Sequence, residues 1–193
     1  MNQYVIETVN LTKKYKTQIA VDRINIHVPK GKIYALLGRN GAGKTTAMKM
    51  LLNLIRPTSG SLSLFGENFS DFSRKNYHRI GSMIEAPAFY ENLTARENLE
   101  ILARLRGRHR KDTVDHALKV VHMDQRDKKL FREYSLGMKQ RLGLAAAMMH
   151  EPELLILDEP MNGLDPVGIH ETRNYLLQLC KEKGTTIFIS SHV

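Results

Sequence analysis

The sequence has few of the features that mark secreted or membrane-spanning proteins. Its 193 residues include a single cysteine, Cys180, so no internal disulfide can form and a reducing compartment is predicted. No basic and apolar leader follows Met1, and we therefore expect no secretory signal. The longest apolar runs, such as 142–149, are too short to cross a bilayer, which takes about 20 residues. These absences predict a chain that is soluble on its own.

The composition is otherwise that of an ordinary globular protein. Hydrophobic residues make up 42% of the chain and charged residues 25%, so disorder is not indicated, and the length suffices for one α/β domain with a small inserted lobe. The net charge of +9 would suit nucleic acid, an anionic membrane surface or a nucleotide-rich site. Because the basic residues lack interleaved aromatics, a solvated basic surface is favoured and nucleic acid is not expected as a partner. None of the eight histidines has a metal-ligand spacing.

A glycine-rich segment at 38–45 carries the strongest chemical signal. An apolar run at 33–37 precedes it and helical apolar spacing follows over 46–55, which predicts strand, turn and helix in that order. Glycines let successive N–H groups point into one concavity, and the helix N-terminus adds roughly half a positive charge there. The alternative is a plain turn with a surface lysine. We expect this loop to hold phosphate through Gly38, Arg39, Asn40, Gly41, Ala42, Gly43, Lys44, Thr45 and Thr46, with the Thr45 hydroxyl also on Mg²⁺.

The remaining pattern places β structure early and helices in the middle. Strands are predicted at 4–9, 24–28 and 61–65, with antiparallel character, and a further strand at 80–85. Thr94 and Glu97 form a predicted capping box. The other predicted elements are a helix from there to about Gly107, helices at 114–121 and 136–150, a buried strand at 153–158, a helix at 168–183 and a strand at 185–190.

Two adjacent carboxylates, Asp158 and Glu159, end the apolar run 154–157. We expect this strand to adjoin the strand before the glycine-rich loop, which would deliver both side chains beside the bound phosphates. Asp158 would then hold Mg²⁺, directly or through water, and Glu159 could polarise the water that attacks the γ-phosphate. For the two carboxylates considered alone, a helix cap or a solvated strand end is the alternative.

These motifs together resemble the ATP-binding subunit of an ABC (ATP-binding cassette) transporter over nearly the whole chain. The segment 134–141, Tyr-Ser-Leu-Gly-Met-Lys-Gln-Arg, resembles the family signature and stands before Asp158 where the family places it. Residues 162–165, Asn-Gly-Leu-Asp, resemble the loop after the catalytic glutamate, and His192 matches the switch histidine. Tyr15 stands where the family carries an aromatic residue that stacks on adenine.

The resemblance implies a fold, cofactors and partners. The expected fold is an α/β P-loop NTPase core of mostly parallel sheet, with an N-terminal antiparallel β subdomain and an inserted helical subdomain. Residues 1–193 would form one ABC ATPase domain, with its core at 1–85 and 150–193 and its helical lobe at about 86–149. ATP and Mg²⁺ are the implied cofactors, a transmembrane permease is the implied partner, and the implied location is cytoplasmic, peripheral on the inner face of the membrane.

The resemblance also implies a head-to-tail homodimer held together by ATP. Ser135 and the N–H of Gly137 begin a predicted helix, so they present a hydroxyl and a positive helix end to an anion. In the family they close on the γ-phosphate bound by the other subunit, with Asp165 in the adjoining loop. An ordinary N-cap is the alternative for Ser135. His192 would act as the γ-phosphate sensor beside Glu159.

Two departures from the family pattern narrow the expectation. Glu85 stands where the family commonly has a glutamine, and a carboxylate there would bind Mg²⁺ more tightly. With the signature variant, this resembles the ATPases of exporters for bacitracin resistance or lantibiotic immunity. Arg39 replaces a more usual proline. The chain also ends one residue after His192, earlier than family members usually do, and we expect a truncated chain.

Two other functions remain open from the sequence. One is an ABC-type ATPase acting on nucleic acid or ribosomes, which only the net charge of +9 favours. The other is a nucleotide-binding regulatory module that does not turn over.

Overall fold

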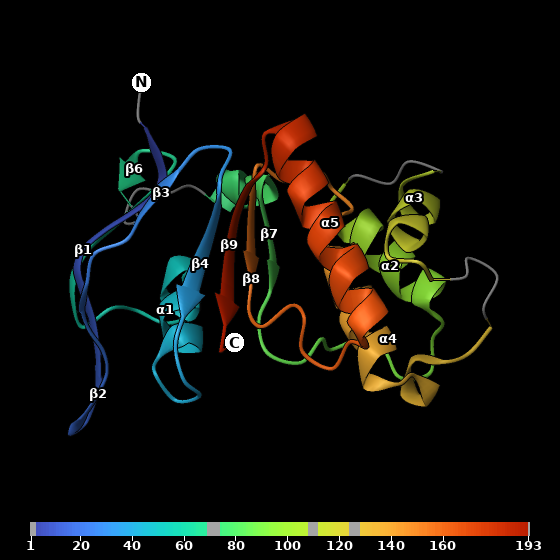
Figure 1. Ribbon diagram of the computed structural model, residues 1–193, viewed down its shortest axis with the longest axis horizontal. Coiled ribbons are helices and arrows are strands. Elements are labelled where there is room, and N and C mark those ends of the chain that lie inside the picture. Colours follow the sequence, from blue (N-terminus) through green and yellow to red (C-terminus); the bar gives the residue numbers. More distant parts are fainter. Residues whose placement is uncertain (1–2, 69–73, 108–111, 124–127, 193) are drawn as a thin grey trace.

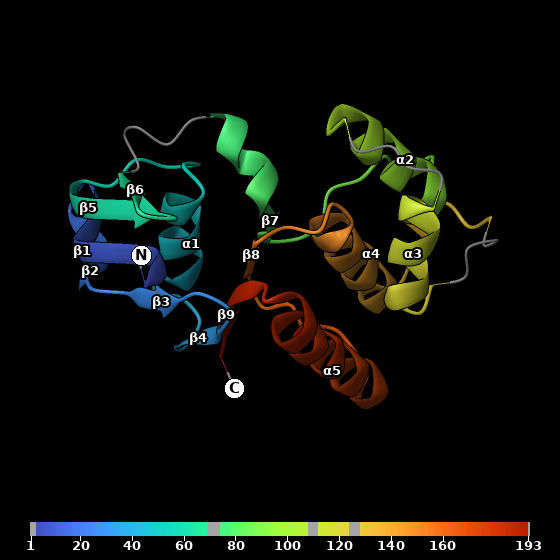
Figure 2. The ribbon, with the colours of Figure 1, turned by 90° about the horizontal axis from the view of Figure 1, so that it is seen from above.

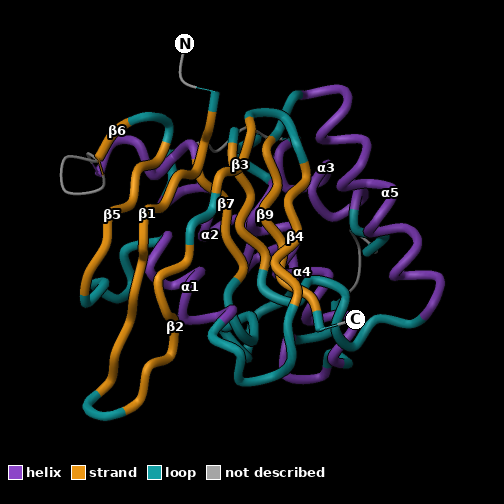
Figure 3. The backbone as a smooth tube through the Cα atoms, turned by 60° about the vertical axis from the view of Figure 1, so that its left-hand side comes forward, coloured by secondary structure: helices purple, strands orange, loops and turns teal. Residues whose placement is uncertain are grey.

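Two β-sheets with helices between and beside them build the molecule. The computed structural model describes residues 3–68, 74–107, 112–123 and 128–192. The first sheet is antiparallel, with strand order β2–β1–β5–β6 and with β3 also paired to β1. Figure 3 shows β5, β1 and β2 side by side on the flank of the molecule. Its strands are β1 (Tyr4–Tyr15), β2 (Gln18–Ile24), β3 (His27–Pro29), β5 (Ser59–Leu64) and β6 (Glu67–Asn68).

The second sheet is parallel and carries the predicted chemistry. Its order is β4–β9–β8–β7, which Figure 1 shows from one side to the other. The prediction that the strand before Asp158 adjoins the strand before the glycine-rich loop is therefore wrong, because β9 lies between them. All three strands are apolar runs, and such a pattern does not encode lateral order. The bounds are β4 (Ile33–Leu37), β9 (Thr186–Ser191), β8 (Leu154–Leu157) and β7 (Ile80–Met83).

Alternate residues of the parallel strands feed two hydrophobic cores. Leu154, Ile156 and Phe188 pack with α1 (Lys44–Leu51) and the antiparallel sheet. Leu155, Leu157 and Ile187 pack on the other face, against the helices. Successive side chains of a strand point to opposite faces, so a central strand with apolar residues at every position is covered on both sides. The sheet thus holds the site at its carboxyl edge between two cores.

The middle of the chain forms a helical lobe, as predicted. Figure 2 shows it on the side away from α1 and the antiparallel sheet. The predicted capping box is confirmed, because Thr94 accepts from the Glu97 N–H and Glu97 reaches back to the Thr94 N–H. The lobe meets β7 closely, since a Cβ at Gly143 of α4 would lie 2.8 Å from Met83 Sδ. The lobe contains α2 (Ala95–Leu105), α3 (Thr113–Val120), the 3-10 turn η2 (Phe131–Glu133) and α4 (Leu136–Met148).

Several predicted boundaries differ from the observed ones. The first helix ends at Leu51 rather than 55, because Asn53 adopts a left-handed φ of 58° that closes the turn. The strand predicted at 24–28 is interrupted, and β2 and β3 flank the gap. The first strand continues to Tyr15 as a hairpin with β2. The 3-10 turn η1 (Arg74–Arg79) precedes β7, and α5 (Pro166–Lys183) connects β8 to β9. Among the helices of the described ranges, none is both long and apolar enough to cross a membrane.

Candidate functional site

The glycine-rich loop joins β4 to α1, and no side chain accepts a hydrogen bond from the first amides of the helix. Gly43 is the N-cap of α1 with φ 88°, and no side chain caps the helix. A Cβ on Gly43 would lie 2.1 Å from the Ala20 carbonyl oxygen of β2, so only glycine fits between the hairpin and the helix start. Gly41 also has a left-handed φ of 83°. The loop and the uncapped helix N-terminus together form a concavity suited to an anion.

Lys44 turns back into this concavity. Its side chain is 8% exposed, and its ammonium donates to the carbonyls of Gly38 at 2.7 Å and Arg39 at 3.2 Å. Nζ also lies 3.2 Å from Glu159 Oε1 as an ion pair. Glu159 Oε1 is buried and accepts no hydrogen bond, so the ion pair with Lys44 is its contact with a polar group. The ammonium therefore occupies the concavity formed by its own loop.

Asp158 is held by two hydroxyls from different elements. Its Oδ2 accepts from Thr45 Oγ1 at 2.7 Å, and its Oδ1 accepts from Ser190 Oγ at 2.6 Å. Thr45 lies on α1 rather than on β4, which explains how it reaches Asp158 across the intervening β9. A hydroxyl and a carboxylate are hard oxygen ligands of the kind that Mg²⁺ prefers. The donor set at Thr45 and Asp158 therefore fits a magnesium ion.

Hydrogen bonds hold the backbone of Glu159 on both sides, and its carboxylate contacts His192 and Lys44. Its φ of 48° is left-handed, its N–H donates to Ser190 Oγ at 2.8 Å, and its carbonyl accepts from Gln140 Nε2 at 3.1 Å. Oε2 lies 2.7 Å from Nδ1 of His192, which follows β9. A non-glycine residue with this φ is costly to hold, and such strain is found at functional sites. Glu159 and His192 are thus brought together as the sequence predicted, with Oε1 facing the Lys44 side.

Glu85 lies at the same edge of the sheet but outside the group around Asp158. It follows β7, its side chain is 62% exposed, and its Oε1 lies 2.5 Å from Lys49 Nζ. No group of three His, Cys, Asp or Glu side chains that could hold a metal occurs among the residues that the structure describes. Its assignment as a magnesium ligand stays a prediction.

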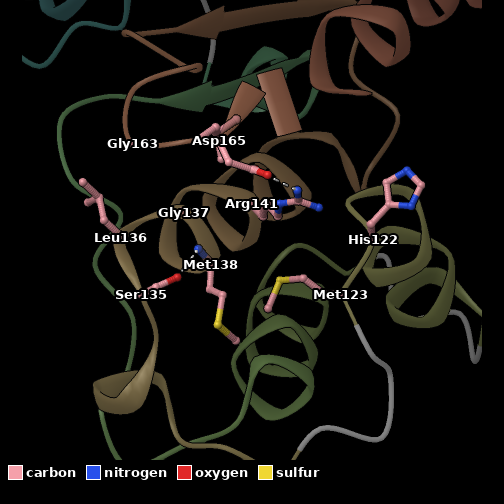
Figure 4. Close-up of a pocket in the computed structure, with 10 residues that line it drawn as sticks. His122, Met123, Ser135, Leu136, Gly137, Met138, Arg141, Gly163 and Asp165 are labelled. Atoms are coloured by element: carbon pink, nitrogen blue, oxygen red, sulfur yellow. Dashed lines mark hydrogen bonds and ion pairs between the residues drawn. The ribbon is translucent and has the colours of Figure 1, made fainter. Parts of the chain in front are cut away.

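The signature residues lie in a separate hollow of about 580 Å³, shown in Figure 4. Ser135 is the N-cap of α4 and accepts from the Met138 N–H at 3.3 Å. Gly137 packs against the loop after β8, since a Cβ there would lie 3.1 Å from the Gly163 carbonyl. Asp165 is the N-cap of α5, and its Oδ1 is 3.8 Å from Arg141 Nη2. None of the residues lining this hollow belongs to the glycine-rich loop. The hollow and the loop are therefore separate within one chain.

The other predicted contact residues are exposed or half-buried. Tyr15 ends β1 and is 46% exposed, with Lys13 Nζ 4.9 Å from its ring centroid. Arg39, Asn40 and Ala42 are exposed, and Thr46 is half-buried on α1. The exposed ring has a face that a planar base could use, which keeps adenine stacking at Tyr15 as a prediction.

Three residues that hold the site together were not predicted from the sequence. Ser190 bonds Asp158 and Glu159, Gln140 bonds the Glu159 carbonyl, and Lys49 bonds Glu85. The sequence carries no clear signal for them, and it is the structure that shows Ser190 and Gln140 to be buried polar residues, 1% and 6% exposed. Buried polar groups need partners, and such positions point to a network.

Comparisons with known proteins agree with this geometry. A family profile described as ABC transporter matches residues 21–162. The bacitracin transport ATP-binding protein BcrA of Enterococcus faecalis is 63% identical over 191 residues, 99% of this chain and 62% of that protein. The lantibiotic transport ATP-binding protein SrtF of Streptococcus pyogenes is 43% identical over 98% of this chain and 80% of its own. A dimeric ATP-binding cassette solved in a post-hydrolysis state with ADP and phosphate has a TM-score of 0.87 at 23% identity, over 97% of this chain and 88% of that one.

These matches differ in what they establish. At 23% identity the solved cassette shows the fold alone, and the chain spans 62% of the length of BcrA. The profile covers well over half of the chain, and SrtF is matched over most of its length. The chain therefore belongs to the ABC transporter family, among its ATP-binding proteins.

Proposed function

We propose that this protein binds and hydrolyses ATP to power export through a separate transmembrane permease, on the inner face of the membrane. The observation that carries the proposal is the pairing of Glu159 with Lys44 on one carboxylate oxygen and with His192 on the other. A carboxylate aimed into an anion cradle beside its lysine is placed to take a proton from a water there.

The loop amides and Lys44 bind the triphosphate. The Lys44 ammonium donates hydrogen bonds to the carbonyls of Gly38 and Arg39, and these contacts hold the side chain in the concavity of the loop. On binding, the ammonium exchanges these carbonyls for phosphate oxygens, and the α1 N-terminus adds its partial positive charge. Lys44 also moves away from Glu159, which frees Oε1 for water.

Glu159 activates the attacking water and His192 orients it. The contact of His192 with Oε2 leaves Oε1 as the oxygen that can accept the proton of a water in line with the γ-phosphate. Mg²⁺ held at Thr45 and Asp158, with Glu85 as a further proposed ligand, would neutralise charge that develops on the phosphate oxygens. Tyr15 would stack on the adenine.

A second copy of the chain completes the site. The hollow at Ser135, Gly137 and Asp165 is open to solvent and separate from the glycine-rich loop, which supports a head-to-tail pairing in which these groups meet the γ-phosphate of the partner subunit. A similar solved cassette is itself dimeric, which supports a dimer. The relatives are named for transport, which gives the nucleic-acid alternative no support.

The proposed cargo is bacitracin or a peptide of related chemistry such as a lantibiotic. The identity of 63% to BcrA favours bacitracin over the lantibiotic assignment, for which the identity is 43%. Co-expression with the permease that co-purifies with this protein should raise the inhibitory concentration of bacitracin in a sensitive bacterium. The rise should disappear in Lys44→Ala, which removes the phosphate-binding charge.

The ATPase is tested by Glu159→Gln, which keeps the shape of the side chain and removes its basicity. A working ATPase should lose turnover and accumulate an ATP-bound dimer, measured by phosphate release and by size-exclusion chromatography with ATP. Glu182→Gln on the exposed surface of α5 is the matched control and should behave as wild type. A passive nucleotide-binding module would instead be unaffected by Glu159→Gln, and that result would refute the proposal.

A further inference from the structure

The two parallel strands β7 and β8 end in the same way. They pair in register, with Met83 opposite Leu157, so Glu85 and Glu159 each lie two residues past a matched strand end. Both glutamates have left-handed backbones, with φ of 60° and 48°. Non-glycine residues at such φ are uncommon and are held by their surroundings. The chain therefore turns in the same way past both strand ends, and both glutamates contact lysines of α1.

Helix α1 contacts both strand ends from one face. Thr45 bonds Asp158 at 2.7 Å, and Lys49 lies 2.5 Å from Glu85. Residues four apart lie one above the other on a helix, so the Lys49 contact sits one turn beyond the Thr45 contact. Lys49 is half-buried, with 29% of its side chain exposed, whereas Glu85 is 62% exposed. The lysine is the fixed partner and the carboxylate is the one with room to move.

We propose that Lys49 is a positioning residue that holds the Glu85 carboxylate in the absence of nucleotide and competes for it with Mg²⁺. The inference rests on the proposed function, because it assigns Glu85 a place beside the bound metal. A carboxylate that neutralises an ammonium at hydrogen-bond distance must weaken that contact to ligate a cation. Lys49 thus sets how strongly magnesium strengthens nucleotide binding.

The expected effect is modest, because the ion pair is partly exposed. Pairs of this kind contribute little, and their removal changes an equilibrium by about two- to fivefold. Removing Lys49 should therefore raise the gain in nucleotide affinity that Mg²⁺ provides by about that factor. A simple loss of positive charge near the site would raise magnesium affinity too, but independently of residue 85. The competition model requires the effect to vanish when residue 85 carries no charge.

A double-mutant cycle separates these cases. The probe is a fluorescent, non-hydrolysable ATP analogue, and the readout is the ratio of its dissociation constants without and with Mg²⁺, so turnover is not involved. The proteins are wild type, Lys49→Met, Glu85→Gln and the double variant. Lys49→Arg should restore the wild-type ratio, because the charge returns. Lys183→Met is the matched control, since it removes the surface ion pair with Glu151 at the far end of α5.

The proposal is supported if the ratio is about two- to fivefold higher in Lys49→Met than in wild type and unchanged in Lys183→Met. It also requires that Glu85→Gln and the double variant give the same ratio. An unchanged or lower ratio in Lys49→Met overturns it. The same rise in the Glu85→Gln background overturns it as well, because the charge would act without Glu85. Failure of the proposed function looks different, since wild type itself would then bind no analogue or show no gain from Mg²⁺.

Discussion

The Ser190 hydroxyl links the two halves of the acidic pair to the neighbouring strand. It donates to Asp158 Oδ1 at 2.6 Å and accepts from the Glu159 N–H at 2.8 Å, and the residue is 1% exposed. Ser190→Ala deletes both bonds and changes little else in volume. The variant therefore measures how far one buried oxygen atom fixes the geometry of the site.

The size of the effect follows from the two partners. A hydrogen bond to a charged group contributes about 1.5–3 kcal/mol, and an unpaired buried N–H costs about 1–3 kcal/mol. Both losses arise from one atom and the site can relax around it, so they do not add fully. We expect the free energy of unfolding to fall by about 2–4 kcal/mol. Turnover should fall at least about tenfold, which corresponds to an increase of about 1.4 kcal/mol in the activation free energy when the carboxylates are misplaced.

Urea denaturation of the nucleotide-free protein gives the stability, with the slope m expected to stay unchanged. Ser82→Ala makes the same chemical deletion at an exposed position of β7 and should change stability by less than about 0.5 kcal/mol. Phosphate release under saturating ATP gives the turnover. A stability loss below about 1 kcal/mol together with unchanged turnover would refute the role assigned to the hydroxyl. The stability arm tests the network even if the protein hydrolyses no ATP.

Three further results are expected. Gly43→Ala should abolish nucleotide binding in fluorescence titration, because its φ of 88° strains any Cβ by about 1–3 kcal/mol and the Ala20 carbonyl would lie 2.1 Å away. Thr94→Ala should lower the urea-derived stability by about 1 kcal/mol through loss of the helix cap, and an unchanged midpoint would contradict the observed capping box. The hydrogen bond from Arg79 lowers the pKa of Glu153, so its stabilisation is fully present above the ordinary carboxyl pKa and is lost as pH falls through the lowered one. Arg79→Met should therefore lose less stability than wild type as the pH falls through this range, measured as urea midpoints across pH.

Much of the fold was predictable because local patterns decide it. The apolar run 33–37, the glycine-rich turn and the helix after it are consecutive in the chain, and so is the capping box at Thr94. Lateral order is different, since β4, β8 and β9 each contain an apolar run and only tertiary packing determines which pair adjoins. The hairpin extension to Tyr15 escaped prediction because, after the buried Leu11, the strand continues through the polar residues Thr12, Lys13 and Lys14 without apolar alternation.

The site shows the same division. Lys44, Thr45, Asp158, Glu159 and His192 carry recognisable motifs, and the structure brings them together. The anchoring contacts escaped because each joins residues far apart in the chain, as with Gln140 and the Glu159 carbonyl. The expectation for Glu85 came from the family resemblance, because it stands where the family commonly has a glutamine, and no local pattern reveals that its carboxylate meets a lysine 36 residues earlier.

The two lysines of α1 share one electrostatic pattern. Lys44 faces Glu159 and Lys49 faces Glu85, so each α1 lysine already has a carboxylate from a strand end. In the proposed mechanism an entering triphosphate takes Lys44 from Glu159 and Mg²⁺ takes Glu85 from Lys49, and the first exchange leaves the Glu159 carboxylate beside negative phosphate. Magnesium should therefore matter to binding itself and not only to the reaction. For the same reason Glu159→Gln should bind ATP more tightly than wild type while it stops turnover, because the amide neither holds Lys44 as an ion pair nor repels the γ-phosphate. Weaker binding by that variant would mean that the carboxylate helps to build the cradle rather than compete for it.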